Sequence, residues 1–265
     1  MKALKIFKDL VAFLTIIPLA KDESFLETSA RYMFLFPIVG AIIGLMVAAY
    51  FLLSYHIFTF ILSSLSRVFP FPPEFSVRIF ASAFTLAFLL VLTGLQHFDG
   101  LVDLGNVLGL KSLEERNNLA HAWVVTFKGA FFAFLVEFLN FLGIFLLDPS
   151  ILFASLICGE VCAKLAMVTI AWVGKPAPGG KGSIFAEMNS RRKINFLACL
   201  LSLLIVAPLL RLYGVALILL SLALGIIMER VSTRLFGRVS GDVMGATNEI
   251  GRALSLLLIA AMVMA

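Results

Sequence analysis

Long apolar runs recur along the chain and alternate with shorter segments that carry most of the charged residues. A helix needs about 20 mostly apolar residues to cross the hydrocarbon core of a bilayer, so each long run predicts one crossing. Seven spans are predicted in this way, at residues 33–55, 79–95, 129–147, 150–172, 194–210, 213–229 and 253–265. The last run has only 13 residues. We expect it to be tilted into the bundle or to fall short of a full crossing.

The first 32 residues do not fit this pattern. Their apolar piece, which contains Phe13 and Leu14, is short, is broken by Pro18 and is flanked by lysines. Such a segment is typical of a helix that lies in the membrane interface or re-enters the membrane. No cleavage site of the A-x-A type follows, so we expect the segment to be retained. The predicted fold is an all-α polytopic membrane helical bundle, a single domain over residues 1–265.

Composition supports a membrane protein. The chain is 61% hydrophobic and 14% charged, against about 25% charged residues in an ordinary soluble domain. The net charge of +5 does not indicate a nucleic-acid partner, because the basic residues lie in short loops where positive charge sets topology. We therefore expect membrane lipid, and no nucleic acid, as a partner. A homo-oligomer is compatible with the sequence.

The basic residues also predict the orientation of the chain. With seven spans, the N-terminal segment and the loops 96–128, 173–193 and 230–252 share one face and carry seventeen of the 21 Lys and Arg residues. The opposite face carries three, and Lys164 lies within a span. Cytoplasmic loops of membrane proteins are enriched in Lys and Arg. We therefore expect a multi-pass protein of the cell membrane whose N-terminus and polar loops are cytoplasmic.

A polar motif, His97, Asp99, Asp103 and Asn106, follows the second span directly. Its last three members are spaced i, i+4 and i+7, so on a helix they would share one face. Two carboxylates and an amide oxygen suit a hard cation such as Mg²⁺, with water or phosphate completing the shell. The alternative is that these Asp and Asn residues only cap a solvated helix start.

A second acidic motif precedes the last span. Asp242 and Glu249 have the same i to i+7 spacing, and the small residues Gly245 and Ala246 lie between them. Small residues allow helices to approach closely, so the two acidic motifs, on one predicted face of the membrane, could share one site. The alternative is that the small residues only pack helices and Asp242 caps one.

The remaining polar features are a loop and three buried charges. The glycine-rich basic loop 174–183 offers Lys175, Lys181 and backbone N–H groups to a phosphate, but it lacks the P-loop spacing and fits a flexible linker equally well. Charges inside spans are costly, so Glu137, Glu160 and Lys164 need partners. Glu160 and Lys164 are one turn apart and are expected to pair; the alternative is that they line a polar cavity.

Four stretches of the chain carry a family resemblance that runs nearly end to end. They read Phe13-Leu-Thr-Ile-Ile-Pro18, Phe36-Pro-Ile-Val-Gly40 followed by Gly44, His97-x-Asp99-Gly-Leu-x-Asp103, and Gly241-Asp-Val-Met-Gly-Ala-Thr-x-Glu249. In this order they resemble motifs of the cobalamin synthase family, the membrane enzymes called adenosylcobinamide-GDP ribazoletransferases. Two stretches depart from the family pattern. Asn106 stands where a third Asp is common, and residues 123–130 share only Gly129 and Ala130 with a K-D-S-R-x-G-A-like segment.

The resemblance implies transfer of the adenosylcobinamide phosphate moiety of adenosylcobinamide-GDP to a ribosyl hydroxyl of α-ribazole or its 5′-phosphate, with release of GMP and with Mg²⁺ as cofactor. Phosphoryl transfer of this kind requires the charge on the phosphates to be neutralised. The implied roles are metal ligation by Asp99, Asp103 and Asp242, further ligation or orientation by Asn106 and Glu249, base or phosphate contact by His97, and GDP phosphate binding by Lys175 and Lys181.

Two other functions stay open at this point. A CDP-alcohol phosphotransferase also uses Asp-Gly-containing helices and a divalent metal, but the chain lacks the DG-x₂-AR continuation of that family. A transporter would account for the Gly- and Pro-interrupted spans and for Glu160 and Lys164 within them. Against transport, no internal repeat is visible and the polar residues crowd one membrane face.

Overall fold

The computed structural model describes residues 2–19, 24–69, 71–120, 122, 124–175 and 183–264. Within these residues the chain forms twelve α-helices and two short 3-10 helices, with no strand. The all-α prediction is therefore confirmed.

Seven of the helices are long and apolar enough to cross a membrane, as predicted. The chain is a multi-pass membrane protein. The spanning helices are α3 (Phe36–Leu65, extended by the 3-10 turn Met33–Leu35), α4 (Pro73–Leu92), α7 (Phe127–Leu146), α8 (Pro149–Val173), α10 (Phe196–Leu210, after the 3-10 turn Lys193–Asn195), α11 (Leu212–Phe236) and α12 (Gly241–Met264).

The predicted first residue of the last span was wrong. We expected a short span at 253–265, either tilted into the bundle or falling short of a full crossing, after a loop at 230–252. Instead α12 begins at Gly241 and its membrane-spanning part runs to Val263. Asp242 and Glu249 therefore lie on a spanning helix. Arg252, which we counted among the loop cations, is inside the bundle and only 1% exposed. The first span is also longer than predicted, because α3 continues to Leu65.

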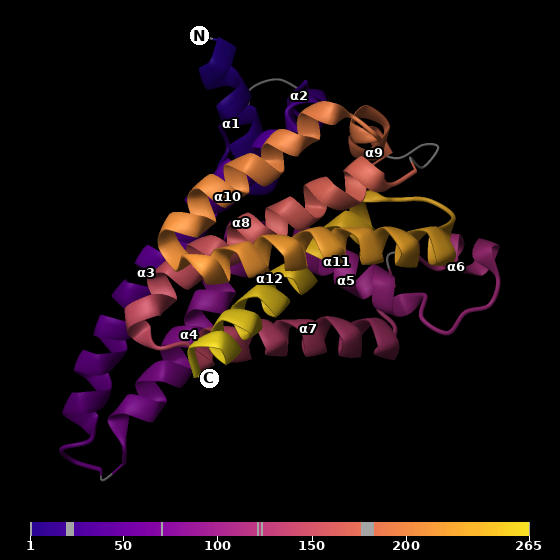
Figure 1. The fold of residues 1–265 in the computed structure, drawn as a ribbon. Coiled ribbons are helices and arrows are strands. Elements are labelled where there is room, and N and C mark those ends of the chain that lie inside the picture. Colours follow the sequence, from indigo (N-terminus) through magenta and orange to yellow (C-terminus); the bar gives the residue numbers. More distant parts are fainter. Residues whose placement is uncertain are drawn as a thin grey trace.

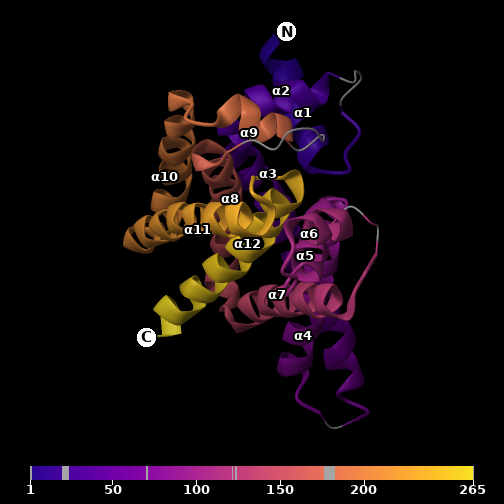
Figure 2. The same ribbon diagram turned by 90° about the vertical axis from the view of Figure 1, so that its right-hand side faces the viewer.

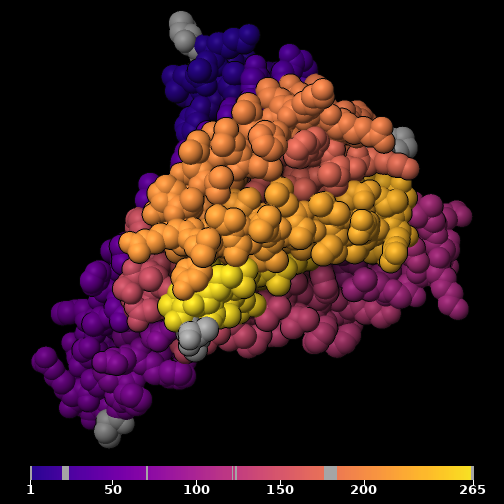
Figure 3. Space-filling view, in the orientation of Figure 1, coloured from indigo at the N-terminus to yellow at the C-terminus, as the bar shows by residue number. Residues whose placement is uncertain are grey.

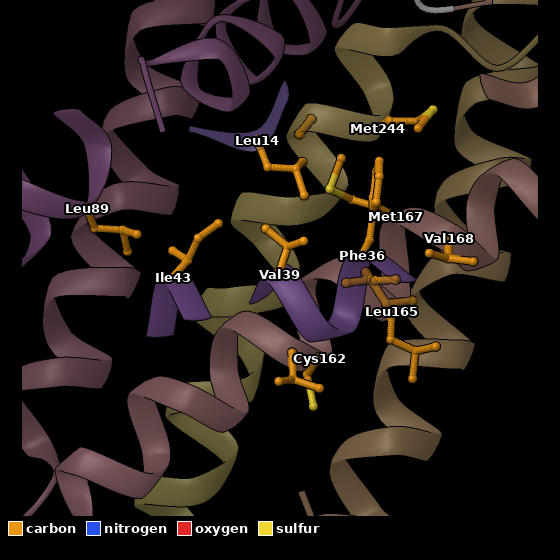
Figure 4. Packing of buried hydrophobic residues seen from close by; sticks show 14 of the residues in the cluster. Leu14, Phe36, Val39, Ile43, Leu89, Cys162, Leu165, Met167, Val168 and Met244 are labelled. Carbon is orange, nitrogen blue, oxygen red and sulfur yellow. The ribbon is translucent and has the colours of Figure 1, made fainter. Parts of the chain in front are cut away.

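Helix α8 forms the centre of the bundle. It packs against α3, α10, α11 and α12. In an 18-residue apolar stretch of this helix, 83% of the residues are buried. Figure 4 shows the core at this helix, where Cys162, Leu165 and Met167 of α8 lie among side chains of α3 such as Phe36 and Val39. In the space-filling view α10 and α11 cover one side of the bundle (Figure 3). Helices on the outside present apolar side chains such as Phe134 and Leu204, as expected for contact with lipid.

The segments that connect successive spans lie at the two ends of the bundle, each at the end that the order of the spans requires. At one end Asn189 donates a hydrogen bond to Ala30 O (2.9 Å), Arg191 N to Trp172 O (2.8 Å), Val239 N to Lys175 O (3.0 Å) and Arg116 Nη1 to Arg234 O (3.1 Å). At the other end Arg78 donates to the carbonyl of Leu147 (3.2 Å). The described parts of the N-terminal segment and of the predicted loops 96–128 and 173–193, together with residues 237–240 before α12, therefore share one end, which we call the polar end.

The N-terminal segment forms two helices at the polar end rather than one. Helix α1 (Lys2–Leu14) buries Leu10, Val11 and Leu14, and α2 (Phe25–Arg31) packs against it. Figure 1 shows α1 and α2 next to each other near the N-terminus. Helix α2 packs against α9 (Ser183–Asn189), and Figure 2 shows the three helices together. Neither α1 nor α2 is a candidate span. The remaining helices, α5 (Gln96–Asn106) and α6 (Leu113–Ala120), lie between α4 and α7 in the chain.

Candidate functional site

The two acidic motifs meet where α5 packs against the start of α12. A Cβ on Gly100 would lie 2.2 Å from the backbone oxygen of Asp242, and one on Gly245 would lie 3.1 Å from Cα of His97. Only glycine at position 100 allows the helices to approach this closely. The small residues of both motifs thus bring Asp99 and Asp103 of α5 to the same place as Asp242 of α12. Figure 2 shows α5 beside α12 in the middle of the molecule.

The three aspartates of this junction repel one another. Asp99 is exposed, whereas Asp103 and Asp242 are partly buried. Burial, and then the charges of Asp242 and Asp99, raise the pKa of Asp103 to about 7. A carboxylate whose charged form is disfavoured by two neighbouring carboxylates is stabilised by a bound cation. We call Asp99, Asp103 and Asp242 the acidic cluster.

As the side chains stand, no group of three His, Cys, Asp or Glu residues in the described parts of the chain has the geometry to hold a metal ion. The donor chemistry nevertheless fits Mg²⁺, which is a hard cation. In proteins Mg²⁺ usually keeps several waters and binds one or two carboxylates together with substrate phosphates. A closed ligand set before substrate binds is therefore not required.

Asn106 lies on α5 one turn beyond Asp103, but its amide is engaged elsewhere. Oδ1 accepts hydrogen bonds from Thr126 N (3.0 Å) and Thr126 Oγ1 (2.7 Å), and Nδ2 donates to Val124 O (2.7 Å). Both acceptor positions of the amide oxygen are used, and the residue is 3% exposed. Thr126 in turn caps α7 by accepting from Gly129 N (3.1 Å). Asn106 thus joins the end of α5 to the start of α7.

Glu249 lies two turns along α12 from Asp242 and belongs to a buried charge network. Arg252 donates to both oxygens of Glu249 and to Glu160, and Lys164 Nζ lies 3.4 Å from Glu160 Oε2. The predicted pairing of Glu160 with Lys164 is confirmed. All four side chains are at most 2% exposed. Among these four side chains two carboxylates balance two cations, as a low-dielectric interior requires.

The third ionisable residue predicted within a span, Glu137, is also buried and lies beside this network. Asn140 Nδ2 donates to Glu137 Oε2 (3.2 Å) and to the carbonyl of Glu249 (3.4 Å).

His97 connects this network to the polar end. Its Nδ1 lies 3.4 Å from Glu249 Oε1 and 3.2 Å from Asn248 Nδ2, while Asn248 Oδ1 accepts from Lys164 Nζ (2.7 Å). Burial, and then the charge of Lys164, lower the pKa of His97, against the opposing effect of its hydrogen bond with Glu249. His97 is therefore neutral near pH 7.

A pocket of about 190 Å³ opens beside His97 and Asp242. It is lined by residues from five helices and from the start of α12, namely Phe13, Leu26, Gln96, His97, Met167, Phe185, Gly241, Asp242, Met244 and Gly245. The polar part of this lining includes a predicted metal ligand, Asp242, and a predicted base, His97. The apolar part consists mainly of aromatic and methionine side chains.

Of the two lysines predicted to bind phosphate, the structure describes Lys175. Lys175 is exposed at the end of α8, and its carbonyl accepts from Val239 N, which brings it close to the start of α12. Lys181 lies outside the described residues.

Sequence reasoning missed Arg252 and Asn248 in the network and Phe13, Met167 and Phe185 in the pocket. Arg252 had one signal, its i,i+3 spacing from Glu249 on one helix. The others depend on contacts between distant segments.

Fold and site together define a polytopic helical membrane protein with an acidic cluster and a half-apolar pocket at one end of its bundle. Comparison with known proteins gives the family. The chain belongs to the cobalamin-5-phosphate synthase family, whose family model matches residues 6–260.

Individual relatives agree with this result. The chain is 32% identical to an adenosylcobinamide-GDP ribazoletransferase of Methanocella arvoryzae, over 93% of this chain and 91% of the relative. Proteins of the same name from Halorubrum lacusprofundi and Methanosarcina mazei are 31% and 28% identical, over 93% and 96% of this chain and 93% and 91% of their own lengths. No solved structure matches the chain significantly.

Proposed function

We propose that this chain is an adenosylcobinamide-GDP ribazoletransferase, which joins the adenosylcobinamide phosphate moiety to α-ribazole or its 5′-phosphate. The observation that carries the proposal is the family match over residues 6–260, which includes both acidic motifs. Relatives with this name match the chain over almost its whole length. The family description names a 5-phosphate product, so both acceptors are substrates to test.

The reaction is an attack at phosphorus. A ribosyl hydroxyl oxygen of the acceptor bonds to the phosphorus that carries the cobinamide, and the bond from that phosphorus to the bridging oxygen breaks. GMP leaves with the bridging oxygen, and the hydroxyl proton must be taken up by a base. Charge develops on phosphate oxygens throughout, so positioning and neutralisation are the main tasks of the protein.

Mg²⁺ is the cation we propose for the acidic cluster. Asp99, Asp103 and Asp242 would hold it, and it would neutralise the diphosphate. Asn106 and Glu249 were predicted as additional ligands. Their hydrogen bonds to Thr126 and Arg252 favour a supporting role for both. The ligand set proposed for the site is therefore limited to the three aspartates.

His97 is the base we propose for the ribosyl hydroxyl. The proposal takes the tautomer in which Nδ1–H donates to Glu249, and not the one in which Nδ1 accepts from Asn248 Nδ2. The neutral ring then keeps a lone pair on Nε2, and the residue lines the pocket beside Asp242. A neutral imidazole held in one orientation is suited to accept a proton. Lys175, near the start of α12, and Lys181 are proposed contacts of the GDP phosphates, and they would act as point charges.

We also propose that the polar end faces the cytoplasm, since it carries most of the Lys and Arg residues even without Arg252. Lys2 and Lys8, two of the three exposed lysines of α1, would then contact anionic lipid at the inner leaflet. No observation favours the transporter, because Glu160 and Lys164 pair with each other and with Arg252 and Asn248.

The test is GMP release by the purified chain with adenosylcobinamide-GDP, either acceptor and Mg²⁺. We expect release together with cobalamin formation, and loss of both with EDTA or in Asp99→Ala. The matched control is Glu114→Ala, which removes an exposed acid from α6 at the same end and should retain turnover. Absence of product from folded wild-type protein with both acceptors would refute the proposed function.

A further inference from the structure

The apolar side of the pocket is built from segments that are far apart in the chain. Phe13 of α1 lies against Phe185 of α9 with ring centroids 4.7 Å apart, and against Phe36 of α3 at 5.9 Å. Leu26 of α2, Met167 of α8 and Met244 of α12 also line the apolar part of the pocket. Phe185, Met167 and Met244 are at most 3% exposed, whereas Phe13 is only partly buried. Phe13 is thus the ring of this wall that a ligand can reach.

The wall has the character of a surface for a flat aromatic group. Aromatic rings pack favourably against other rings, and methionine side chains adapt to ring faces and edges. Gln96, His97 and Asp242 supply polar groups to the same pocket. A ligand that fills the pocket should therefore combine a flat apolar part, for the rings and methionines, with hydroxyl or phosphate groups for these polar side chains.

Of the groups in the two substrates, the base of the acceptor fits best. A corrin ring is far too large for about 190 Å³. The guanine of the donor has several donors and acceptors on its edge, and burying them without partners against Phe and Met is costly. The benzimidazole base of α-ribazole carries few such groups. Its ribose would then be available to the polar side chains Gln96, His97 and Asp242.

We propose that the pocket binds the aromatic base of the acceptor nucleoside, with Phe13 as the exposed ring of the binding wall. The ribosyl hydroxyl is thereby placed beside His97 and Asp242. This assigns a role to the N-terminal motif from Phe13 to Pro18, which the proposed chemistry does not use. The inference rests on the proposed function, because it takes the acceptor from that reaction.

The kinetic test varies one substrate at a time. Phe13→Leu keeps an apolar side chain of similar size but removes the ring, whereas Phe13→Tyr keeps the ring. We expect Phe13→Leu to raise KM for α-ribazole by about threefold to tenfold, the range of an aromatic contact. KM for adenosylcobinamide-GDP should stay within about twofold, and Phe13→Tyr should behave like wild type. Phe131→Leu, on the exposed face of α7, is the matched control.

An equilibrium measurement separates this inference from the proposed function. Binding of labelled α-ribazole to the full chain without donor should weaken in Phe13→Leu by the same factor as KM rises. If wild-type protein turns over but Phe13→Leu changes the donor KM instead, the pocket binds guanine and the inference is wrong. Unchanged KM and Kd for α-ribazole would overturn it equally. If wild type binds α-ribazole through Phe13 but releases no GMP, the inference stands and the proposed reaction falls.

Discussion

His97 and Glu249 are in contact inside the protein, with Nδ1 of the histidine 3.4 Å from Oε1 of the glutamate. One residue lies on a helix of the polar end and the other on a spanning helix. Through Arg252 the contact extends to Glu160 and Lys164 of α8. The orientation of the proposed base is therefore coupled to the charge balance in the core of the bundle.

Glu249→Gln removes one of the two carboxylates that balance Arg252 and Lys164. Breaking a buried ion pair from one side costs about 3–5 kcal/mol, because the remaining charge is left without a partner. We expect the free energy of unfolding, measured by SDS titration of the detergent-solubilised protein, to fall by about that amount. Turnover should fall as well, because the neutral amide oxygen of Gln is a weaker acceptor for His97 Nδ1 than a carboxylate is.

The double variant Glu249→Gln, Arg252→Gln tests the cause. It leaves Glu160 paired with Lys164, so the charges balance again and the loss should be smaller than in Glu249→Gln alone. A metal ligand would behave differently. If Glu249 bound Mg²⁺, its substitution would raise the Mg²⁺ requirement with little change in stability, and the second substitution would restore nothing.

The repulsion within the acidic cluster predicts a pH-dependent effect on stability. The pKa of Asp103 is raised from 3.8 to about 7 by burial and by Asp242 and Asp99. Above its unfolded pKa the unfolded chain releases this proton before the folded chain does, so stability falls as pH rises through this range. With EDTA, Asp103→Asn should therefore melt a few degrees above wild type near pH 8, and the gain should shrink near pH 5.

Two comparisons control this experiment. Glu114→Gln, at an exposed acid of α6, should leave the melting temperature unchanged at both pH values. Asp103→Asn should also lose turnover in spite of its higher stability, because a proposed Mg²⁺ ligand is removed. A variant that melts lower than wild type at pH 8 without metal would show that Asp103 is stabilised by a cationic partner and not strained by its neighbours.

Because α5 and α12 approach each other so closely, we expect Gly100→Ala to reduce both stability and activity strongly. Its Cβ would meet the backbone oxygen of Asp242 at 2.2 Å, which only a shift of the helices can relieve. Overpacking of this kind costs about 1–3 kcal/mol. Because the shift moves Asp242 away from Asp99 and Asp103, we expect GMP release to fall more than tenfold while most of the protein remains folded.

Gly159→Ala is the matched control, since it is also a glycine within a helix. There the nearest atoms are Cδ2 and Cγ of the Leu256 side chain, at 3.2 and 3.4 Å, and no backbone atom of a neighbouring helix lies as close. This variant should keep turnover and gain or lose little stability. Equal activity of the two variants would show that the spacing of α5 and α12 does not set the geometry of the acidic cluster.

The sequence predicted the number of spans but misplaced the start of the last one, and the reason is physical. Residues 241–252 carry Asp242, Glu249 and Arg252, and such charges normally mark a loop. Here Glu249 and Arg252 pair with each other, and Arg252 pairs with Glu160 on α8, so the helix continues into the bundle. Sequence reasoning paired Glu160 with Lys164 because that contact is local. It had no means of finding a partner 92 positions away.

In the candidate site, too, local features could be predicted from the sequence and contacts between distant segments could not. Spacing along each helix predicted the two acidic motifs, and the small residues Gly245 and Ala246 predicted their close approach. The pocket wall could not be predicted, because Phe13, Met167 and Phe185 come together only through packing of α1, α8 and α9. The two departures from the family pattern also proved to be one feature, since Asn106 is hydrogen-bonded to Thr126 within the second departing stretch.

This contact gives the last prediction, for Asn106→Asp. The carboxylate keeps an acceptor for Thr126 but replaces the Nδ2 donor, so a second oxygen faces Val124 O at the present 2.7 Å. Two buried acceptors without a proton between them repel, and a lost buried hydrogen bond of this kind costs about 1–3 kcal/mol. We expect Asn106→Asp to unfold at lower SDS concentration and to bind Mg²⁺ no more tightly than wild type. A ligand role makes the opposite prediction, because a carboxylate binds Mg²⁺ better than an amide does. Tighter Mg²⁺ binding with unchanged stability would return Asn106 to the metal site.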